Sequence, residues 1–389
     1  MNMEKLGKYC KIISGYAFKS NDLSEGTEIP VIKIGNISNG NDVIIDSSTQ
    51  YVSSDFLSID EKYHIKKGDV LISLTGSHIN QPNSMVGRSC RNFSDTEFLL
   101  NQRAGKVIPN ENADKNYLYY LLNTESFKYS ICNRAYGAAN QANVSPSDIE
   151  NIKWNFPPLP TQQKIASILS AYDNLIQNYK KQIEALQTAA SELYKEWFVR
   201  FRFPGWQNAK FENGIPEGWK VVLASELGEF VRGKNITAEE MQEGMIPVIS
   251  AGIEPSGFHN QSNVKGVSLT ISNSGANAGY LQINYSNIWA ADCSYCNSAK
   301  HIYFYYELLN NMRVVLFNLQ KGAAQPHVYA KDINKMKILL PSTELIGTAN
   351  KKIKLMHEKI YSLQQQITNL TQQRNLLLPR LMSGKLEVK

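Results

Sequence analysis

The chain has 389 residues, of which 42% are hydrophobic and 20% charged, with a formal net charge of +6 and a pI near 8.8. This length exceeds one ordinary core and predicts two or three domains, and the abundant aromatic residues exclude a disordered chain. No apolar run approaches the roughly 20 residues that a membrane helix needs, and no apolar signal region follows the N-terminal charges. We therefore expect a cytoplasmic protein with no membrane association.

Residues 1–158 are predicted to form a first globular domain of the α+β class. Short runs rich in β-branched residues, such as IPVIKIGNI, DVLISLTG and AGKVIP, are bounded by Gly, Asn and Ser, which is typical of strands. The stretch NYLYYLLNTESFKYSI indicates one or two short helices. Gly76 follows one of these strands, and we interpret it as a tight-turn residue.

A long helix is predicted at 159–200, directly after the proline-rich stretch NFPPLPTQQK. From Ile165, apolar residues recur at alternating spacings of four and three as far as Trp197, which is the pattern of a coiled-coil seam. Tyr172 and Tyr179 fall on this seam, so we interpret them as packing residues rather than stacking platforms. A helix of this kind is marginal alone in water and needs a partner.

The second half of the chain repeats this order. We expect a linker at 201–215 and a second α+β domain at 216–342, with strands such as VSLTISNSG and GYLQINY. A second long helix with a C-terminal tail is predicted at 343–389. Its seam runs from Ala349 to Leu381, with Arg374 as the one polar member. Six basic residues and one acidic residue lie between 345 and 380, which is weak evidence for nucleic acid because solvated helix faces are commonly charged. The simplest way to bury both seams is to pack the helices together.

Subtraction of residue numbers reveals an internal repeat. Ala349 minus Ile165 and Leu381 minus Trp197 both equal 184. Upstream of the helices, GAANQANVSPSDI matches GAAQPHVYAKDI, EGTEIPVIKIGNI matches EGMIPVISAGI, and KLGKYCKIISG matches SELGEFVRG. The whole chain is therefore one unit used twice, with most divergence in the middle of each globular part. Such a pattern favours one scaffold with two different recognition surfaces.

Catalytic and metal-binding motifs are not evident in the sequence. The stretch GEFVRGKN resembles a phosphate loop, but Asn235 occupies the place of the Mg²⁺-binding hydroxyl residue. Cys293 and Cys296 form a single CxxC without a second pair, and the six histidines show no ligand spacing. We expect no catalytic residue, no metal and five free thiols.

The complete arrangement resembles the specificity subunit of type I restriction-modification systems. The resemblance rests on PPLPTQQKIASIL and PSTELIGTANKKI before the two helices, on GAA…Q and DI leading into each, and on IPEGWK opening the second globular part. It covers essentially the whole chain. The second junction departs from the first because PSTELIG replaces PPLPTQQ, so docking there is expected to be weaker.

This resemblance implies a subunit without catalysis of its own. Each globular part would be a target-recognition domain that reads one half of a bipartite site in double-stranded DNA. The two helices would form an antiparallel coiled coil that sets the spacing, related by a pseudo-two-fold repeat. Two methyltransferase (modification) subunits would dock on it and restriction (helicase-nuclease) subunits would join. No cofactor is expected on the chain itself, since S-adenosylmethionine belongs to the methyltransferase.

Polar residues on loops of both copies are the candidates for DNA contact, because Asn and Gln pair with adenine, Arg pairs with guanine, and hydroxyls and Lys position phosphates. In the first copy they are Lys33, Asn36, Thr75, Ser77, Asn80, Gln81, Gln102, Arg103, Asn140, Gln141 and Asn143. In the second they are Asn273, Ser274, Asn277, Tyr280, Lys300, Gln325 and His327. The polar TQQK turn predicts a partner-docking site at Gln162, Gln163 and Lys164, which we expect to be exposed.

Two other functions remain open on the sequence. One is a coiled-coil adaptor whose globular ends bind proteins, and the other is a regulator of a restriction system. A specificity subunit would bind its DNA site tightly as a complex, whereas an adaptor would show no sequence preference.

Overall fold

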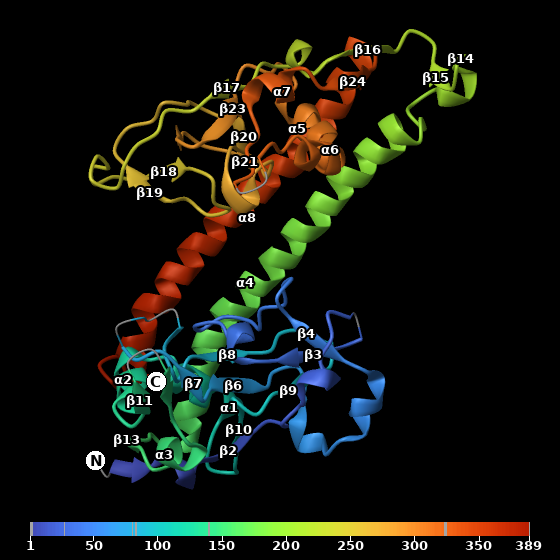
Figure 1. The fold of residues 1–389 in the computed structure, drawn as a ribbon. Helices are drawn as coiled ribbons and strands as arrows, with labels where there is room; N and C mark the ends of the chain where they lie inside the picture. Colours follow the sequence, from blue (N-terminus) through green and yellow to red (C-terminus); the bar gives the residue numbers. More distant parts are fainter. Residues whose placement is uncertain are drawn as a thin grey trace. The chain divides into compact units, whose positions relative to one another are not determined.

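The computed structural model describes residues 3–26, 28–79, 81, 84–138, 141–322 and 325–388. The chain divides into two compact units, the first formed by Met1–Asn178 with Ile367–Lys389 and the second by Tyr179–Gln366. Each unit therefore contains one globular part and one end of each long helix (Figure 1). Among the described residues, no helix is both long and apolar enough to cross a membrane.

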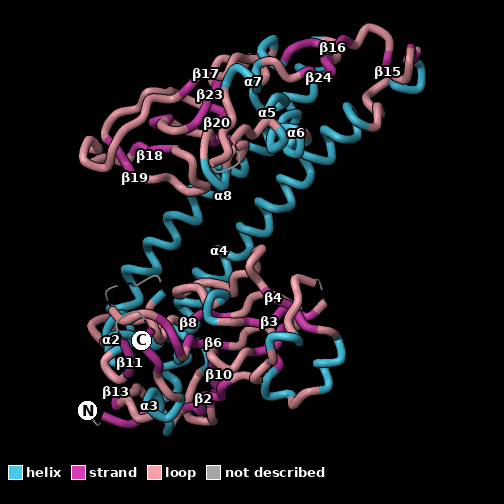
Figure 2. Tube along the Cα trace, viewed as in Figure 1, coloured by secondary structure: helices cyan, strands magenta, loops and turns pink. Residues whose placement is uncertain are grey.

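The two predicted long helices are present (Figure 2). α4 spans Leu159–Tyr194 and continues into a π-helical turn at Lys195–Val199, and α8 spans Thr343–Met382. The predicted seam positions are shielded on both helices. Among the buried or half-buried positions are Leu169, Tyr172, Ile176, Tyr179, Ala190, Trp197, Ala349, Ile353, Ile360, Leu363, Arg374 and Leu381.

Within each unit the helices meet end to start, which makes them antiparallel. In unit 1, Ile165 and Leu169 near the start of α4 share a core with Leu381 at the end of α8. In unit 2, Tyr194 at the end of α4 shares a core with Ile346 near the start of α8. The predicted packing of one helix on the other is confirmed.

Unit 1 is built on a four-stranded antiparallel sheet with the order β2-β10-β6-β8. A second four-stranded sheet, β4-β3-β9-β5, contains the parallel pair β3 and β9, and smaller sheets are β1-β13 and β11-β12-β7. The strands are β1 (Met3–Lys5), β2 (Cys10–Ser14), β3 (Ile29–Ile32), β4 (Gln50–Val52), β5 (His64–Ile65), β6 (Val70–Ser73), β7 (Thr75–Gly76), β8 (Ser89–Arg91), β9 (Phe98–Leu100), β10 (Ala104–Pro109), β11 (Tyr136–Ala138), β12 (Gln141–Asn143) and β13 (Lys153–Asn155).

Three short helices complete unit 1: α1 (Lys115–Leu122), α2 (Glu125–Cys132) and α3 (Pro146–Glu150). Each begins at a side chain that accepts a hydrogen bond from the first turn, namely Asp114, Thr124 and Ser145. The apolar residues of α1 and α2 lie in the same core as Ile165 and Leu169 of α4. The long helix therefore forms part of the core of the globular part.

Unit 2 repeats this plan with fewer strands among its described residues. Its sheets are β17-β23-β20-β21, β19-β18-β22, β16-β24 and the hairpin β14-β15 within the linker. The strands are β14 (Phe211–Glu212), β15 (Ile215–Pro216), β16 (Lys220–Leu223), β17 (Val231–Arg232), β18 (Ile246–Ile249), β19 (Gly257–His259), β20 (Ser268–Ser272), β21 (Leu281–Asn284), β22 (Trp289–Ala290), β23 (Cys293–Cys296) and β24 (Lys337–Leu340). The helices are α5 (Ile302–Asn311), α6 (Arg313–Asn318) and α7 (Ala330–Asn334).

The predicted repeat is confirmed by strand pairing. Both copies of the sequence IPVI form a strand with a parallel neighbour, β3 with β9 and β18 with β22. The pair β1-β13 corresponds to β16-β24, and the sheet β2-β10-β6-β8 corresponds to β17-β23-β20-β21. The α+β class predicted for both globular parts is therefore correct.

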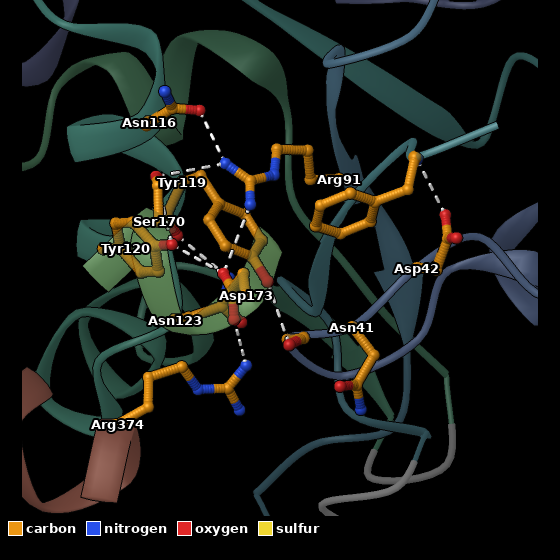
Figure 3. A network of polar contacts seen from close by, with 12 residues as sticks. Asn41, Asp42, Arg91, Asn116, Tyr119, Tyr120, Asn123, Ser170, Asp173 and Arg374 are labelled. Atoms are coloured by element: carbon orange, nitrogen blue, oxygen red, sulfur yellow. Dashed lines mark hydrogen bonds and ion pairs between the residues drawn. The ribbon is translucent and has the colours of Figure 1, made fainter. Parts of the chain in front are cut away.

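A buried carboxylate on α4 connects three elements of unit 1 (Figure 3). Asp173 Oδ2 accepts hydrogen bonds from Tyr120 Oη of α1 at 2.6 Å and from Arg91 Nη2 of β8 at 3.2 Å. Its other oxygen, Oδ1, accepts from Arg374 Nη1 of α8 at 2.5 Å. The side chains of Asp173 and Arg91 are 4% and 5% exposed, so the pair is shielded from water. Asp173 thus holds the globular part to both long helices.

Further contacts engage the Arg91 guanidinium in this dry site, although its buried Nε has no hydrogen-bond partner among the described residues. Nη1 donates to Asn116 Oδ1 at 2.6 Å, and the guanidinium carbon lies 4.5 Å from the ring centroid of Phe93 and 4.9 Å from that of Tyr119. Cation–π contacts of this kind gain strength when water is excluded. Arg374, the one polar seam residue, is therefore explained by its ion pair with Asp173.

The position of unit 2 that corresponds to Asp173 carries a different residue, which also connects a long helix to a short one. His357 of α8 lies 184 positions after Asp173, the offset of the two seams, and is 1% exposed. Its Nε2 lies 3.1 Å from Glu307 Oε1 of α5 and its Nδ1 lies 2.8 Å from Tyr285 Oη. Both copies thus fix a long helix to a short helix through a buried polar side chain.

We predict that Asp173→Asn destabilises unit 1 by about 3 kcal/mol, because it leaves the buried Arg91 without its counter-ion. Native-state hydrogen exchange of the α1 amides measures this opening free energy. The matched control is Glu61→Gln, which removes an exposed ion pair to Lys66 and should leave α1 exchange unchanged. Unchanged α1 protection in Asp173→Asn would contradict the assigned role.

Candidate nucleic-acid interface

Three loops of unit 1 meet at Leu74, directly after β6. The Leu74 amide donates to the carbonyl of Arg103 in the β9–β10 turn at 3.0 Å, and the Leu74 carbonyl accepts from the amide of Val144 after β12 at 3.0 Å. These two bonds bring the residues next to Leu74, Arg103 and Val144 close together. We call it the first loop junction.

The same junction recurs in unit 2 at Asn273. The Asn273 amide donates to the carbonyl of Asp292 at 3.3 Å, and the Asn273 carbonyl accepts from the amide of Val328 at 2.9 Å. We call it the second loop junction. The two copies therefore build one backbone frame and carry different side chains on it.

A close backbone approach fixes each frame and explains two glycines. A Cβ on Gly15 would lie 2.2 Å from the carbonyl oxygen of Leu100, and one on Gly233 would lie 2.4 Å from that of Ala291. Real Cβ atoms do not approach this closely, so both positions need glycine. Because Gly15 and Gly233 end the repeated segments KLGKYCKIISG and SELGEFVRG, the sequence repeat carried this signal.

The first loop junction brings together seven of the residues predicted to contact DNA. Thr75 and Ser77 are buried and support the loops, since Thr75 Oγ1 donates to Asn143 Oδ1 at 2.8 Å and Ser77 Oγ to the Gln81 carbonyl at 2.8 Å. The exposed or half-buried members are Gln81, Gln102, Arg103, Gln141 and Asn143. Two further predicted residues, Asn80 and Asn140, lie outside the described part of the chain.

The second loop junction brings together five predicted residues. Asn273 and Ser274 are buried: Asn273 Oδ1 accepts from Ser294 Oγ at 2.7 Å, and Ser274 Oγ donates to the Asp292 carboxylate. The exposed or half-buried members are Asn277, Gln325 and His327, and the ring of His327 stacks on that of Tyr329 with centroids 6.1 Å apart.

Four predicted residues lie outside these junctions. Asn36 is buried, and its amide donates to the Ile44 carbonyl at 2.8 Å and to Thr49 Oγ1 at 3.0 Å, so it is a structural turn residue. Lys33 donates to Gln50 Oε1, and burial lowers its pKa. Tyr280 precedes β21, and exposed Lys300 precedes α5.

Sequence reasoning missed Asp292, the counterpart of Arg103. The equivalence follows from backbone bonds, because the Gly15 amide donates to the carbonyl of the residue after Arg103 and the Gly233 amide to that after Asp292. The β22–β23 turn is one residue shorter, so Gln102 has no counterpart. A cation at the first loop junction is thus replaced by a carboxylate at the second.

The predicted exposure of Gln162 is wrong. Its side chain is 0% exposed, and Oε1 accepts from the Asp114 amide at 3.1 Å while Nε2 donates to the carbonyls of Asn112 at 3.2 Å and Pro157 at 3.0 Å. Gln162 therefore fastens the start of α4 to the start of α1. Its neighbours Gln163 and Lys164 are exposed as predicted.

No group of three or more metal-ligating side chains occurs in the described part of the chain. All five cysteines are buried free thiols, and burial raises the pKa of Cys10, Cys90 and Cys293 to about 12. A thiol with so high a pKa is a poor nucleophile. These thiols serve as small apolar side chains.

The tight-turn interpretation of Gly76 applies equally to Gly275 after β20, but the two glycines differ in kind. Gly275 has φ of +74° and open space around it, which fits a turn. Gly76 is required by close packing instead, since a Cβ there would lie 2.3 Å from the Ser84 carbonyl oxygen.

We therefore predict that Gly76→Ala destabilises unit 1 by about 1–3 kcal/mol through overpacking at the first loop junction. Gly35→Ala is the matched control, because a Cβ there meets nothing within 4 Å, and it should change stability by less than about 0.5 kcal/mol. Urea unfolding curves of both variants provide the measurement. Equal stability of the two would show that the β7 loop relaxes freely.

Comparison with known proteins gives one family. The family model for the type I restriction modification DNA specificity domain matches residues 1–188 and again residues 216–379. The MjaIX type I restriction enzyme specificity subunit of Methanocaldococcus jannaschii is 27% identical over 321 residues, which cover 75% of this chain and 74% of that protein. The putative MjaX specificity subunit of the same organism is 36% identical over 170 residues, covering 43% of this chain and 38% of that protein.

A solved structure supports the same fold. The S subunit of a type I restriction-modification system from M. genitalium superposes with a TM-score of 0.61 at 18% identity, covering 98% of this chain and 95% of that one. Since the family model matches well over half of the sequence in two successive segments, the chain belongs to the type I restriction-modification DNA specificity family.

Proposed function

We propose that each unit reads one half of a bipartite sequence in double-stranded DNA through its loop junction. The observation that carries the proposal is the frame built twice with different side chains. A common frame would present both junctions to DNA in the same way, while the side chains on it would select different bases.

At the first loop junction, Arg103 and Gln102 are the base-reading candidates. Both are exposed in the β9–β10 turn, and their backbone is held by bonds to Leu74 and Tyr16. An arginine pairs in bidentate fashion with guanine and a glutamine with adenine in the major groove. Gln81, Gln141 and Asn143 lie beside them as further candidates, whereas buried Thr75 and Ser77 support the loops.

At the second loop junction the candidates are Asn277, Gln325 and His327, together with Asp292. A carboxylate accepts a hydrogen bond from the amino group of cytosine, so Asp292 would favour that base. Because a carboxylate repels phosphate, Asp292 would not add to DNA affinity as the cationic Arg103 would at the first loop junction. Lys33, Tyr280 and Lys300 remain candidates for contact with the sugar–phosphate backbone of DNA.

We predict that Gln102→Ala with Arg103→Ala weakens binding of the assembled complex to its DNA site by about 10- to 100-fold, since a good bidentate contact contributes about 1–3 kcal/mol. Sequencing of methylated sites should show relaxed specificity in one half and an unchanged second half. Lys11→Ala, an exposed cation on β2, is the control and should alter neither. Relaxation of both halves would contradict independent reading.

The chain would work without catalysis of its own. Two modification subunits would supply S-adenosylmethionine-dependent methyl transfer, restriction subunits would complete the assembly, and the long helices would set the spacing between half-sites. Transfer to a base requires that the base leave the helical stack, which suits a division between reading and chemistry.

The start of α4 is the proposed docking site for a modification subunit. Gln163 and Lys164 are exposed on the first turns, while Gln162 fixes the same turns to α1. A rigid helix start with exposed polar side chains is a suitable surface for specific docking.

Gln163→Ala combined with Lys164→Glu is expected to reduce co-purification of the modification subunit while leaving the melting temperature unchanged. Gln162→Ala should instead lower the melting temperature, because the buried backbone groups that Gln162 contacts lose their partners. Calorimetry and the mass of the purified complex distinguish the two. A full assembly from the double variant would place docking elsewhere.

A further inference from the structure

A cavity of about 1030 Å³ opens in unit 1 between α2, the loop after β7 and the end of α8. Trp154, Leu378 and Met382 give it an apolar lining, with Ile79 and Tyr129 at 41% and 46% exposure. Unlike the loop junctions, this surface is recessed and mainly apolar. None of the functions considered so far uses it.

Lys128 lies in the wall of this cavity and is a buried cation with no carboxylate partner in the described part of the chain. Its side chain belongs to a residue only 9% exposed, and Nζ donates to Asn39 Oδ1, a neutral acceptor. The ion pairs within the described residues include none at Lys128. A buried ammonium is costly unless an anion pairs with it.

The charges facing Lys128 do not supply that anion. Glu125, one turn earlier on α2, lines the cavity but is not within ion-pair distance, and Arg88 adds repulsion. Arg380 and Lys385 line the α8 side of the cavity and are exposed. Lys128, Arg380 and Lys385 therefore line the cavity together with one carboxylate, that of Glu125.

Burial lowers the pKa of the Lys128 amine to about 8, an effect that Glu125 partly opposes. An anion bound beside the amine would raise that pKa again, because it stabilises the charged form. Binding would then take up a proton and weaken as the pH rises through about 8.

We propose that this cavity receives an acidic segment of the modification subunit, with a carboxylate paired to Lys128 and an adjacent apolar side chain on Trp154 and Met382. The inference rests on the proposed function, since it assigns a contact to that partner. Charge complementarity selects an anion, and the apolar lining favours a peptide over DNA. DNA phosphates are contacted by cationic and polar groups, so the apolar part of this lining would offer them no contact.

Lys128→Met tests the pairing because it keeps the length and apolar stem of the side chain while it removes the charge. Isothermal titration of the full chain with the purified modification subunit at pH 7 should show at least about tenfold weaker binding, a loss expected for one buried charge pair. Wild-type affinity should fall between pH 7 and pH 9, and the variant should lack this decrease. Lys11→Met, at an exposed site, is the control and should match wild type.

Stability separates this role from simple misfolding. Because Lys128→Met removes an uncompensated buried charge, its melting temperature should equal or exceed that of wild type. Binding unchanged within twofold, or a weaker affinity that keeps the wild-type pH dependence, would overturn the proposal. Failure of the wild-type chain itself to bind the subunit would overturn the proposed function and this inference with it.

A photo-reactive phenylalanine at Tyr129 identifies the occupant in the assembled complex. We expect a crosslink to a modification-subunit peptide that carries Asp or Glu next to an apolar residue. A crosslink to DNA, or to a peptide without an acidic residue, would contradict the assignment. Phe258, 57% exposed in unit 2, is the control position and should not yield the same peptide.

Discussion

The buried charge of Asp173 is the constraint on which unit 1 depends. A carboxylate whose side chain is only 4% exposed is tolerated only because Tyr120, Arg91 and Arg374 surround it with donors. Those donors come from a short helix, a sheet strand and the other long helix. The site is therefore satisfied only when all three are in place, which fixes the globular part on the helices. The first loop junction follows β6, which belongs to the same sheet as β8 with Arg91. The position of this junction on the long helices therefore depends on the Asp173 contacts.

Both copies of the repeat have a buried polar residue on a long helix at the equivalent position, but the chemistry of that residue differs. Asp173 and His357 lie 184 positions apart, as do the seams, yet one is a carboxylate among cations and the other an imidazole beside Glu307. Neither set of partners would satisfy the other residue. Each globular part is thus matched to its own helix segment, although the backbone plan is shared. Conserved scaffold and divergent contacts suit a protein that must present two different reading surfaces.

In the proposed function, buried side chains of the loop junctions support the loops and exposed side chains contact DNA. The hydroxyls of Thr75, Ser77 and Ser274 donate hydrogen bonds within the protein. Gly15 and Gly233 permit the close backbone approach at each junction. Arg103 and Asp292 occupy equivalent places with opposite charge. Rigid supports keep the exposed side chains in fixed positions, which specific reading of bases requires. The same separation explains why many polar loop residues suggested by the sequence prove to be structural.

The sequence by itself determined the two long helices, their seams, the α+β class and the repeat, because periodicity, proline junctions and strand-forming runs act locally. The family resemblance rested on the same local motifs and is confirmed. Tertiary structure decided which polar residues are buried: Gln162 accepts from the Asp114 amide just before α1, Asn36 closes a turn, and Asp173 pairs with an arginine 201 positions away. Composition cannot separate these residues from exposed ones, since a polar side chain is recognised as structural only once its distant partners are known.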